Sequence, residues 1–212
     1  MSNNSFNQIL NKSWLLFIIS IFCAVAILIA TNFFEPNRPS HTEVQHVEHL
    51  IDLERKYSIA NILSAPNNNW QKRDRDLTSL GISNEVHWFR FTIENGPPTN
   101  SRLLEIDYPL LDSVNLWFTQ DNKVLAQYTV GDSLVFAQRV IEHENFVFPV
   151  PTNGQPVDVY ISAHTQGAMR LPLNIWQQED YLEYTSKNSL LMGGFFGLML
   201  AMGLSNLFFF IT

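Results

Sequence analysis

Two long apolar stretches bracket a polar middle in this chain of 212 residues. Residues 14–34 and residues 190–211 contain no charged side chain. About twenty apolar residues, at a helical rise of about 1.5 Å each, cross the roughly 30 Å hydrocarbon core of a bilayer. Both stretches are therefore predicted to be membrane helices. The segment 1–34 fits either a cleaved signal peptide or a retained membrane anchor.

Between these stretches the apolar positions alternate with a period of two, which is typical of strands. In residues 86–93, Phe89 and Phe91 lie on one face, and Trp88 and Arg90 lie on the other. Similar alternation or a short apolar run recurs in residues 104–108, 114–118, 124–130, 146–150, 157–163 and 171–175. About seven or eight short strands separated by turn residues predict an all-β sandwich or barrel over residues 43–177.

The lead-in to this domain is less clearly patterned. Residues 35–42 are polar and contain proline, which predicts a linker. The apolar positions of residues 43–63 fit a strand or a short helix equally well. Residues 64–78 are rich in Asn, Asp, Arg and Lys and are predicted to form a surface loop.

The pattern changes after the last predicted strand. Glu179 and Asp180 suit the positive end of a helix dipole, and no Gly or Pro follows until Gly193. Residues 178–212 are therefore predicted to be a connecting helix that continues as a membrane helix. No polar or basic flank follows this helix, so we expect the natural protein to continue past Thr212.

Small residues recur every four positions in the second apolar stretch, at Gly193, Gly197, Ala201 and Ser205. Such a ridge lets another helix approach closely in lipid, and the amide of Asn206 prefers a helical partner to lipid. Chance is the alternative, because small residues are common in membrane helices. Helix packing here implies partner helices that this chain does not contain.

Charge and cysteine content narrow the function classes. The formal net charge is −7, so no basic face is available for a nucleic acid. The single cysteine, Cys23, lies in the first apolar stretch, which leaves the middle domain without a disulfide. No nucleophile elbow, phosphate-binding loop or zinc-protease motif occurs. Asp107 and Asp112 flank a proline, where a turn explains them better than acid–base catalysis. We expect neither enzymatic activity nor a cofactor.

Two clusters can bind a ligand. If the face with Trp88 and Arg90 is concave, an aromatic ring and a guanidinium can hold a sugar or a carboxylate. The structural alternative pairs Arg90 with an acid such as Asp112 and places Trp88 in a second core layer. Arg139 and His143 precede a core strand, as a ligand site or as a structural ion pair. His143 can also make recognition depend on pH.

The histidines near residue 45 raise the question of a metal site. His41, His46 and His49 cluster with Glu43 and Glu48, and His46 and His49 would share a face on a helix. No second cluster of ligands is visible in the sequence. A solvated polar lead-in is the preferred interpretation, and no metal is predicted.

Several short motifs together resemble a known family in their order and spacing. They are Trp88-Phe89-Arg90-Phe91 with Asn95, Leu104-Glu105-Ile106-Asp107-Tyr108-Pro109-Leu110-Leu111-Asp112, Gly131-Asp132, Arg139 with His143, Asn145, Phe146, Phe148 and Pro149, Leu171-Pro172-Leu173 with Trp176, and Gly193-Gly194-Phe195-Phe196-Gly197 with Asn206. From about residue 43 onward, the chain resembles the type-2 extracellular domain of the seven-transmembrane receptors with diverse intracellular signalling modules.

The resemblance implies a jelly-roll-like sandwich similar to carbohydrate-binding modules, followed by seven membrane helices and a cytoplasmic output module. Residues 35–188 would lie in the periplasm of a bacterium, with the chain anchored in the inner membrane. We expect a sensory domain for a small molecule such as a carbohydrate, with candidate ligand-binding residues Trp88, Arg90, Asp112, Arg139 and His143. The alternative is an envelope domain that binds another protein.

Overall fold

In the computed structural model of this protein, the chain forms two compact units. One unit is Ser40–Tyr181, and the other comprises Met1–Pro39 and Leu182–Thr212. The described residues are 17, 20, 21, 23, 24, 27, 42–44, 46–64, 69–73, 79–94, 101–151 and 154–211. Most of the predicted N-terminal membrane segment, 1–34, and residues 35–41 of the predicted linker lie outside this set. The few positions described within residues 1–34 are helical.

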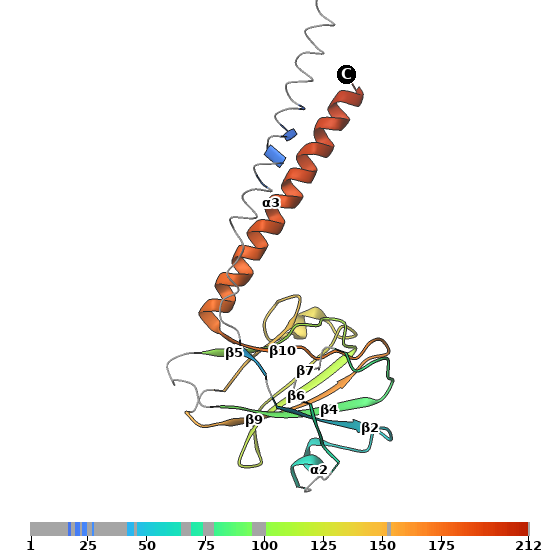
Figure 1. Ribbon diagram of the computed structural model, residues 1–212, viewed down its shortest axis with the longest axis vertical. Coiled ribbons are helices and arrows are strands. Elements are labelled where there is room, and N and C mark those ends of the chain that lie inside the picture. Colours follow the sequence, from blue (N-terminus) through green and yellow to red (C-terminus); the bar gives the residue numbers. More distant parts are fainter. Residues whose placement is uncertain are drawn as a thin grey trace, which may run out of the picture. The chain divides into compact units, whose positions relative to one another are not determined.

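Two antiparallel sheets make up the first unit, in a sandwich-like arrangement (Figure 1). The four-stranded sheet contains, in spatial order, β1 (Thr42–Glu43), β10 (Leu173–Gln177), β5 (Arg102–Ile106) and β8 (Phe146–Pro149). The six-stranded sheet contains β3 (Gln71–Arg73), β2 (Val47–Asp52), β4 (Val86–Ile93), β9 (Val157–His164), β6 (Ser113–Gln120) and β7 (Lys123–Val130). Every neighbouring pair is antiparallel.

The main core lies between the two sheets. Phe89 of β4, Phe118 of β6, Leu104 of β5 and Phe146 and Phe148 of β8 are all fully buried in one cluster. Burying one such side chain stabilises the fold by roughly 1.5–3 kcal/mol. The predicted alternation in residues 86–93 is confirmed, because Phe89, Phe91 and Ile93 all belong to this core.

Turn residues fix the hairpin of β6 and β7. Asp121 has φ 48° and Asn122 has φ 60°, which are the positive values that a tight two-residue hairpin turn requires. At the other end of β7, a Cβ on Gly131 would lie 2.1 Å from the carbonyl oxygen of Asp112. Only glycine therefore allows the backbone after β7 to approach the start of β6 this closely.

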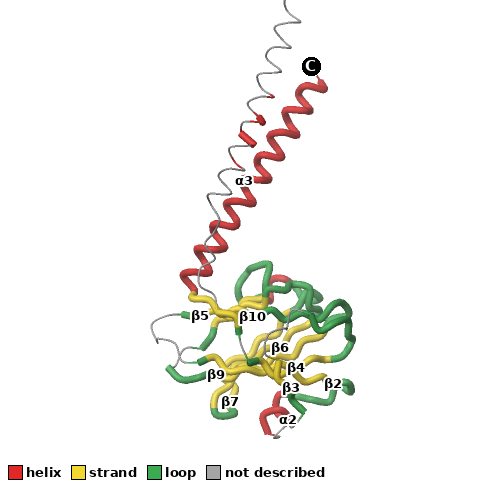
Figure 2. The backbone as a smooth tube through the Cα atoms, viewed as in Figure 1, coloured by secondary structure: helices red, strands yellow, loops and turns green. Residues whose placement is uncertain are grey.

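In the lead-in segment the structure decides between the alternatives for residues 43–63 and departs from one prediction. Residues 47–52 form β2 rather than a helix, and a short helix, α2 (Ile59–Ser64), packs on the outer face of the six-stranded sheet (Figure 2). The loop prediction for residues 64–78 is wrong at Gln71–Arg73, which pairs with β2 as edge strand β3. All three residues of β3 are exposed and polar, so the sequence shows no alternation of apolar and polar positions that would predict a strand here. Charged side chains are a common feature of edge strands.

A single long helix, α3 (Gln178–Ile211), follows β10 without a break. Glu179 and Asp180 occupy its first turn, as predicted. Within Gln178–Phe208 an 18-residue window has mean hydropathy 1.7, so this helix is long and apolar enough to cross a membrane. Near Gly193 and Gly197, an added Cβ would meet no atom within 4 Å. Packing through the small-residue ridge therefore stays a prediction, as do the roles of Ala201, Ser205 and Asn206.

Candidate functional site

A second apolar layer covers part of the outer face of the six-stranded sheet. Leu50, Trp88 and Trp117 of the sheet pack with Ile62 of α2. The Trp88 and Trp117 rings stack with centroids 5.4 Å apart, and Trp88 is only 3% exposed. The ring of Trp88 thus fills a second core layer, as the structural alternative described, and is closed to a ligand in this conformation.

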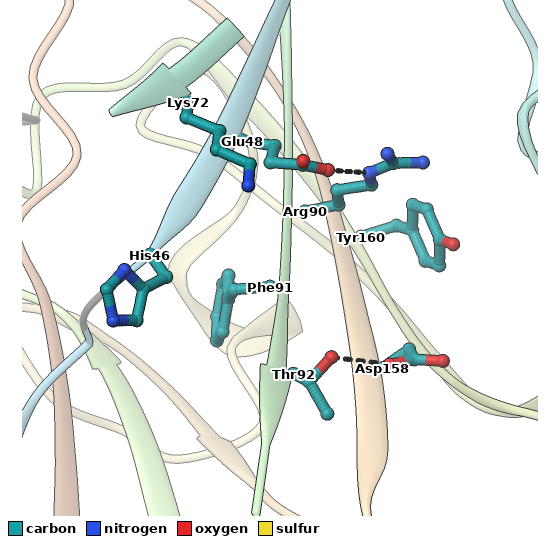
Figure 3. Close-up of a pocket in the computed structure, with 8 residues that line it drawn as sticks. All are labelled: His46, Glu48, Lys72, Arg90, Phe91, Thr92, Asp158 and Tyr160. Carbon is teal, nitrogen blue, oxygen red and sulfur yellow. Dashed lines mark hydrogen bonds and ion pairs between the residues drawn. The ribbon is translucent and has the colours of Figure 1, made fainter. Parts of the chain in front are cut away.

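A row of charged and polar side chains crosses the same face beside this layer. In register order its members are Lys72 of β3, Glu48 of β2, Arg90 of β4 and Tyr160 of β9. The adjacent row pairs Thr92 of β4 with Asp158 of β9. With His46 and Phe91, these residues line a surface pocket of about 390 Å³ (Figure 3). A pocket of this size accommodates one small molecule.

Arg90 is the best anchored cation of the pocket. Its Nε donates to a carboxylate oxygen of Glu48, and its guanidinium lies 4.5 Å from the ring centroid of Trp70. The acid that pairs with Arg90 is therefore Glu48 and not Asp112. Asp112 instead accepts a 2.9 Å hydrogen bond from the backbone N–H of Gln166, and it does not line the pocket.

The other charges of the pocket have few protein partners. Oδ1 of Asp158 accepts a 2.7 Å bond from the hydroxyl of Thr92. Among the residues that the structure describes, none forms a hydrogen bond or ion pair with the Lys72 ammonium. Burial and the neighbouring Asp158 raise the pKa of Tyr160, and Arg90 acts in the opposite direction. The Tyr160 hydroxyl therefore stays protonated at pH 7 and can donate as well as accept.

Arg139 and His143 lie in a different place, on the segment between β7 and β8. Nη1 of Arg139 donates to the carbonyl oxygens of His143 at 2.5 Å and Glu144 at 2.6 Å. The guanidinium lies 4.7 Å from the ring centroids of both Phe136 and Phe146. Arg139 thus holds the loop together around the short 3-10 helix η1 (Phe136–Gln138) through backbone carbonyls, and none of these contacts is with the His143 imidazole or with an acid.

A buried carboxylate that the sequence reasoning did not single out lies next to His143. Glu105 is 3% exposed. Its oxygens accept bonds from Trp176 Nε1 at 2.7 Å, Asn145 Nδ2 at 2.9 Å, Asn174 Nδ2 at 3.3 Å and Tyr181 Oη at 3.5 Å. Tyr181 Oη also lies 2.9 Å from Nδ1 of His143. This Glu105 network joins β5, the start of β8 and β10 to the first turn of α3.

Of the five predicted ligand-binding residues, the structure brings only Arg90 into the pocket. The sequence offered a signal for two of the missed residues, because Asp158 and Tyr160 alternate with the core positions Val157 and Val159. His49 is 2% exposed and faces the core, so it does not belong to a solvated lead-in. Within the described ranges, no group of three His, Cys, Asp or Glu side chains could hold a metal ion.

The chain is distantly similar to three solved bacterial enzymes. Apo Bacteroides uniformis β-glucuronidase 3 is 12% identical, with TM-score 0.41 over 65% of this chain and 22% of that one. A calcium-binding mutant of Bacteroides uniformis β-glucuronidase 2 is 8% identical, with TM-score 0.38 over 64% and 18%. Ruminococcus gnavus β-glucuronidase is 6% identical, with TM-score 0.37 over 64% and 28%. The chain thus spans less than a third of these enzymes.

No curated protein matches the sequence. A family model described as 7TMR-DISM extracellular 2 matches residues 44–177. This range includes every strand from β2 to β10 and all of the residues that line the pocket. The chain therefore belongs to the 7TMR-DISM extracellular 2 family, the sensory extracellular domains of transmembrane receptors.

Proposed function

We propose that the domain is the input domain of a bacterial receptor and that it binds a small hydrophilic molecule in the pocket around Arg90. The observation that carries this proposal is the pocket of about 390 Å³ on the outer face of the six-stranded sheet. Its polar groups converge from four neighbouring strands of one rigid sheet, which supports a preformed site. In this proposal residues 35–188 lie in the periplasm and the helices lie in the inner membrane.

The proposal includes a jelly-roll-like sandwich related to carbohydrate-binding modules, with a carbohydrate as one ligand class. The hydroxyl of Tyr160 and the carboxylate of Asp158 suit sugar hydroxyl groups. We propose binding without turnover. Asp107 and Asp112, the carboxylates considered for catalysis, are both used structurally. Asp107 accepts a 2.7 Å bond from the Asn145 amide, and Asp112 bonds to the backbone of Gln166.

The signal would leave the domain through α3. The first residue of this helix, Gln178, donates its backbone N–H to the carbonyl of Ser101 at 2.9 Å, directly before β5. The Glu105 network holds Tyr181 three residues later. A shift of β5 or β10 on ligand binding would therefore move the start of α3, and through it the other membrane helices and a cytoplasmic output module. Such coupling requires different ligand affinities in two states.

Thermal unfolding of the full chain in lipid nanodiscs tests the proposal. The chain is heated with a panel of sugars, small organic acids and amino acids. A ligand at a hundredfold excess over Kd should stabilise the folded domain by about 2.7 kcal/mol. Arg90→Ala should abolish the shift, and Arg170→Ala, an exposed arginine outside the pocket, should keep it. A shift that survives Arg90→Ala would place the ligand elsewhere.

A protein partner is the second candidate function, and one loop favours it. Val135 is 69% exposed, Phe136 is 51% exposed and Val140 is 42% exposed, so three apolar side chains face solvent on one segment. Clustered exposed apolar residues often mark protein contacts. If no compound of the panel stabilises the domain, crosslinking of the full chain to an envelope protein tests this function. The crosslink should be lost in Phe136→Ser and kept in Arg90→Ala.

A further inference from the structure

The pocket contains two residues of opposite charge, Lys72 and Asp158, that do not form an ion pair with each other. Lys72, on β3, is exposed. Within the part of the chain that the structure describes, its ammonium has no hydrogen-bond or ion-pair partner. Asp158, on β9, uses Oδ1 to accept from Thr92, and its Oδ2 accepts no bond from a described residue. Arg90 and Glu48 neutralise each other in their ion pair. The side chains of Glu48, Lys72, Arg90 and Asp158 together carry no net charge, but one charge of each sign remains available to a ligand.

These two charges lie at separate ends of the pocket. Three strand spacings of about 4.8 Å, roughly 14 Å in all, separate β3 from β9 in the order β3-β2-β4-β9. Figure 3 shows Lys72 on the opposite side of the pocket from the Thr92–Asp158 pair. The four-carbon stem of a lysine leans across part of such a gap. The pocket of about 390 Å³ that both residues line has room for a small molecule with a charge of each sign.

Aromatic surface for a neutral sugar is limited in this pocket. Sugar-binding sites commonly combine hydrogen bonds to the hydroxyl groups with stacking on an exposed aromatic face. The guanidinium of Arg90 covers a face of Trp70, at 4.5 Å from the ring centroid, and Trp88 and Trp117 are buried in the second apolar layer. Of the residues that line the pocket, three carry rings, His46, Phe91 and Tyr160, and of the two benzene-type rings Phe91 is only 5% exposed and Tyr160 is half-buried. A neutral ligand would also leave Lys72 and Asp158 without compensating charges.

We infer that the ligand is a small zwitterion, such as an amino acid, whose carboxylate binds Lys72 and whose protonated amine binds Asp158. This inference rests on the proposed function, because it specifies the ligand of the same pocket. A simple carboxylic acid would satisfy Lys72 and leave Asp158 unpaired, and a simple amine would do the reverse. Complementary charges at both ends also fix the orientation of the bound molecule.

Calorimetric titration of the full chain in nanodiscs tests the inference. The probes are the standard α-amino acids, β-alanine, γ-aminobutyrate, acetate, glucose and N-acetylglucosamine. We expect a zwitterion to bind most tightly. The N-acetyl derivative of this zwitterion lacks the ammonium group, and its methyl ester lacks the carboxylate. Each derivative should bind at least roughly tenfold more weakly, because hydrogen bonds to charged groups contribute more than those between neutral groups.

Matched variants assign each charge to its partner. In Lys72→Gln, esterification should no longer weaken binding. In Asp158→Asn, N-acetylation should no longer weaken it. Lys123→Gln, an exposed lysine outside the pocket, should behave as wild type. If a neutral sugar binds with an affinity that Arg90→Ala abolishes, the pocket is right and the zwitterion inference is wrong. If no probe binds, both are wrong.

Discussion

Nε2 of His49 lies 2.9 Å from Nδ1 of His87, and the two imidazole rings stack with their centroids 5.1 Å apart. Both side chains are only 2% exposed. Burial, with the nearby His87 as the next cause, lowers the pKa of His49 to about 4, and burial also lowers the pKa of His87. Both rings are therefore neutral at pH 7, and a proton on either one would place a cation in a buried site.

We expect the folded domain to lose stability in mild acid. The unfolded chain protonates His49 near pH 6.5, whereas the folded chain does so only near pH 4. The stabilisation is therefore fully present above pH 6.5 and is lost progressively as the pH falls to 4, where both states carry the proton. The loss from this group is about 3 kcal/mol. Urea unfolding across this pH range measures it.

A conservative variant isolates this titration from the other charges nearby. His49→Gln keeps a hydrogen-bonding group beside His87 but cannot be protonated, so its stability should depend less on pH. The other charged groups around the pair are Arg73, Glu85 and His164. They remain in this variant, as they do in the control His46→Gln, which should retain the wild-type pH dependence. Identical pH profiles for wild type and His49→Gln would contradict the assignment.

The Glu105 network should be the most sensitive polar site at the start of α3. Glu105→Gln replaces an acceptor with a donor, and leaves some of the donors from Trp176, Asn145 and Asn174 buried without a partner. Each buried donor left unpaired costs about 1–3 kcal/mol. Tyr181→Phe removes one long bond and the contact with His143, so it should cost only about 1 kcal/mol. Chemical unfolding measures both changes.

Tyr128→Phe is the matched control for Tyr181→Phe. The Tyr128 ring packs on Phe118 and Phe148, and its hydroxyl forms no hydrogen bond with a described residue. Its removal should leave the free energy of unfolding within about 0.5 kcal/mol of wild type. Equal effects of the two tyrosine substitutions would argue against a role for the Glu105 network.

Gly131 should tolerate no side chain. The Cβ of alanine would lie 2.1 Å from the carbonyl oxygen of Asp112, so the ends of β6 and β7 would have to separate. Such overpacking costs about 1–3 kcal/mol or more. Gly167→Ala is the control, because its Cβ would meet only the Thr165 hydroxyl at an ordinary 3.5 Å. A thermal midpoint in Gly131→Ala equal to that of the control would contradict this account of the turn.

Arg139 should matter for the loop and not for the pocket. Arg139→Ala removes two hydrogen bonds to carbonyl oxygens and the contacts with Phe136 and Phe146, and we expect a loss of about 1–3 kcal/mol. Arg139→Lys should restore little, since an ammonium lacks the flat fork of a guanidinium. Ligand affinity should be unchanged in both variants. A selective loss of affinity would return Arg139 to the ligand-binding residues.

Local patterns predicted much of the fold because they depend on neighbours in sequence. The alternation of Phe89 and Phe91 placed one face of β4 on the core. The polar edge strand β3 and the helix α2 lacked such a pattern. Their positions depend on pairing with β2 and on the second apolar layer, which are tertiary effects.

The pocket could not be predicted from sequence for the same reason. Glu48 meets Arg90 across 42 positions of sequence, and only the register of β2 against β4 selects it over other acids. A one-residue slip would have turned Glu48 to the core. The sequence indicated that Arg90 lies opposite the core face of β4. It could not indicate that Trp88, on the same face, lies under α2.

The central claim is that the pocket around Arg90 holds the ligand. The most direct measurement is a calorimetric titration of the full chain with the best-binding small molecule, compared between wild type, Arg90→Lys and Arg170→Lys. Arg90→Lys keeps the charge but loses the Nε contact to Glu48 and the flat face on Trp70. We predict that it weakens binding roughly tenfold or more, and that Arg170→Lys changes nothing. Equal affinities in all three proteins would contradict the account.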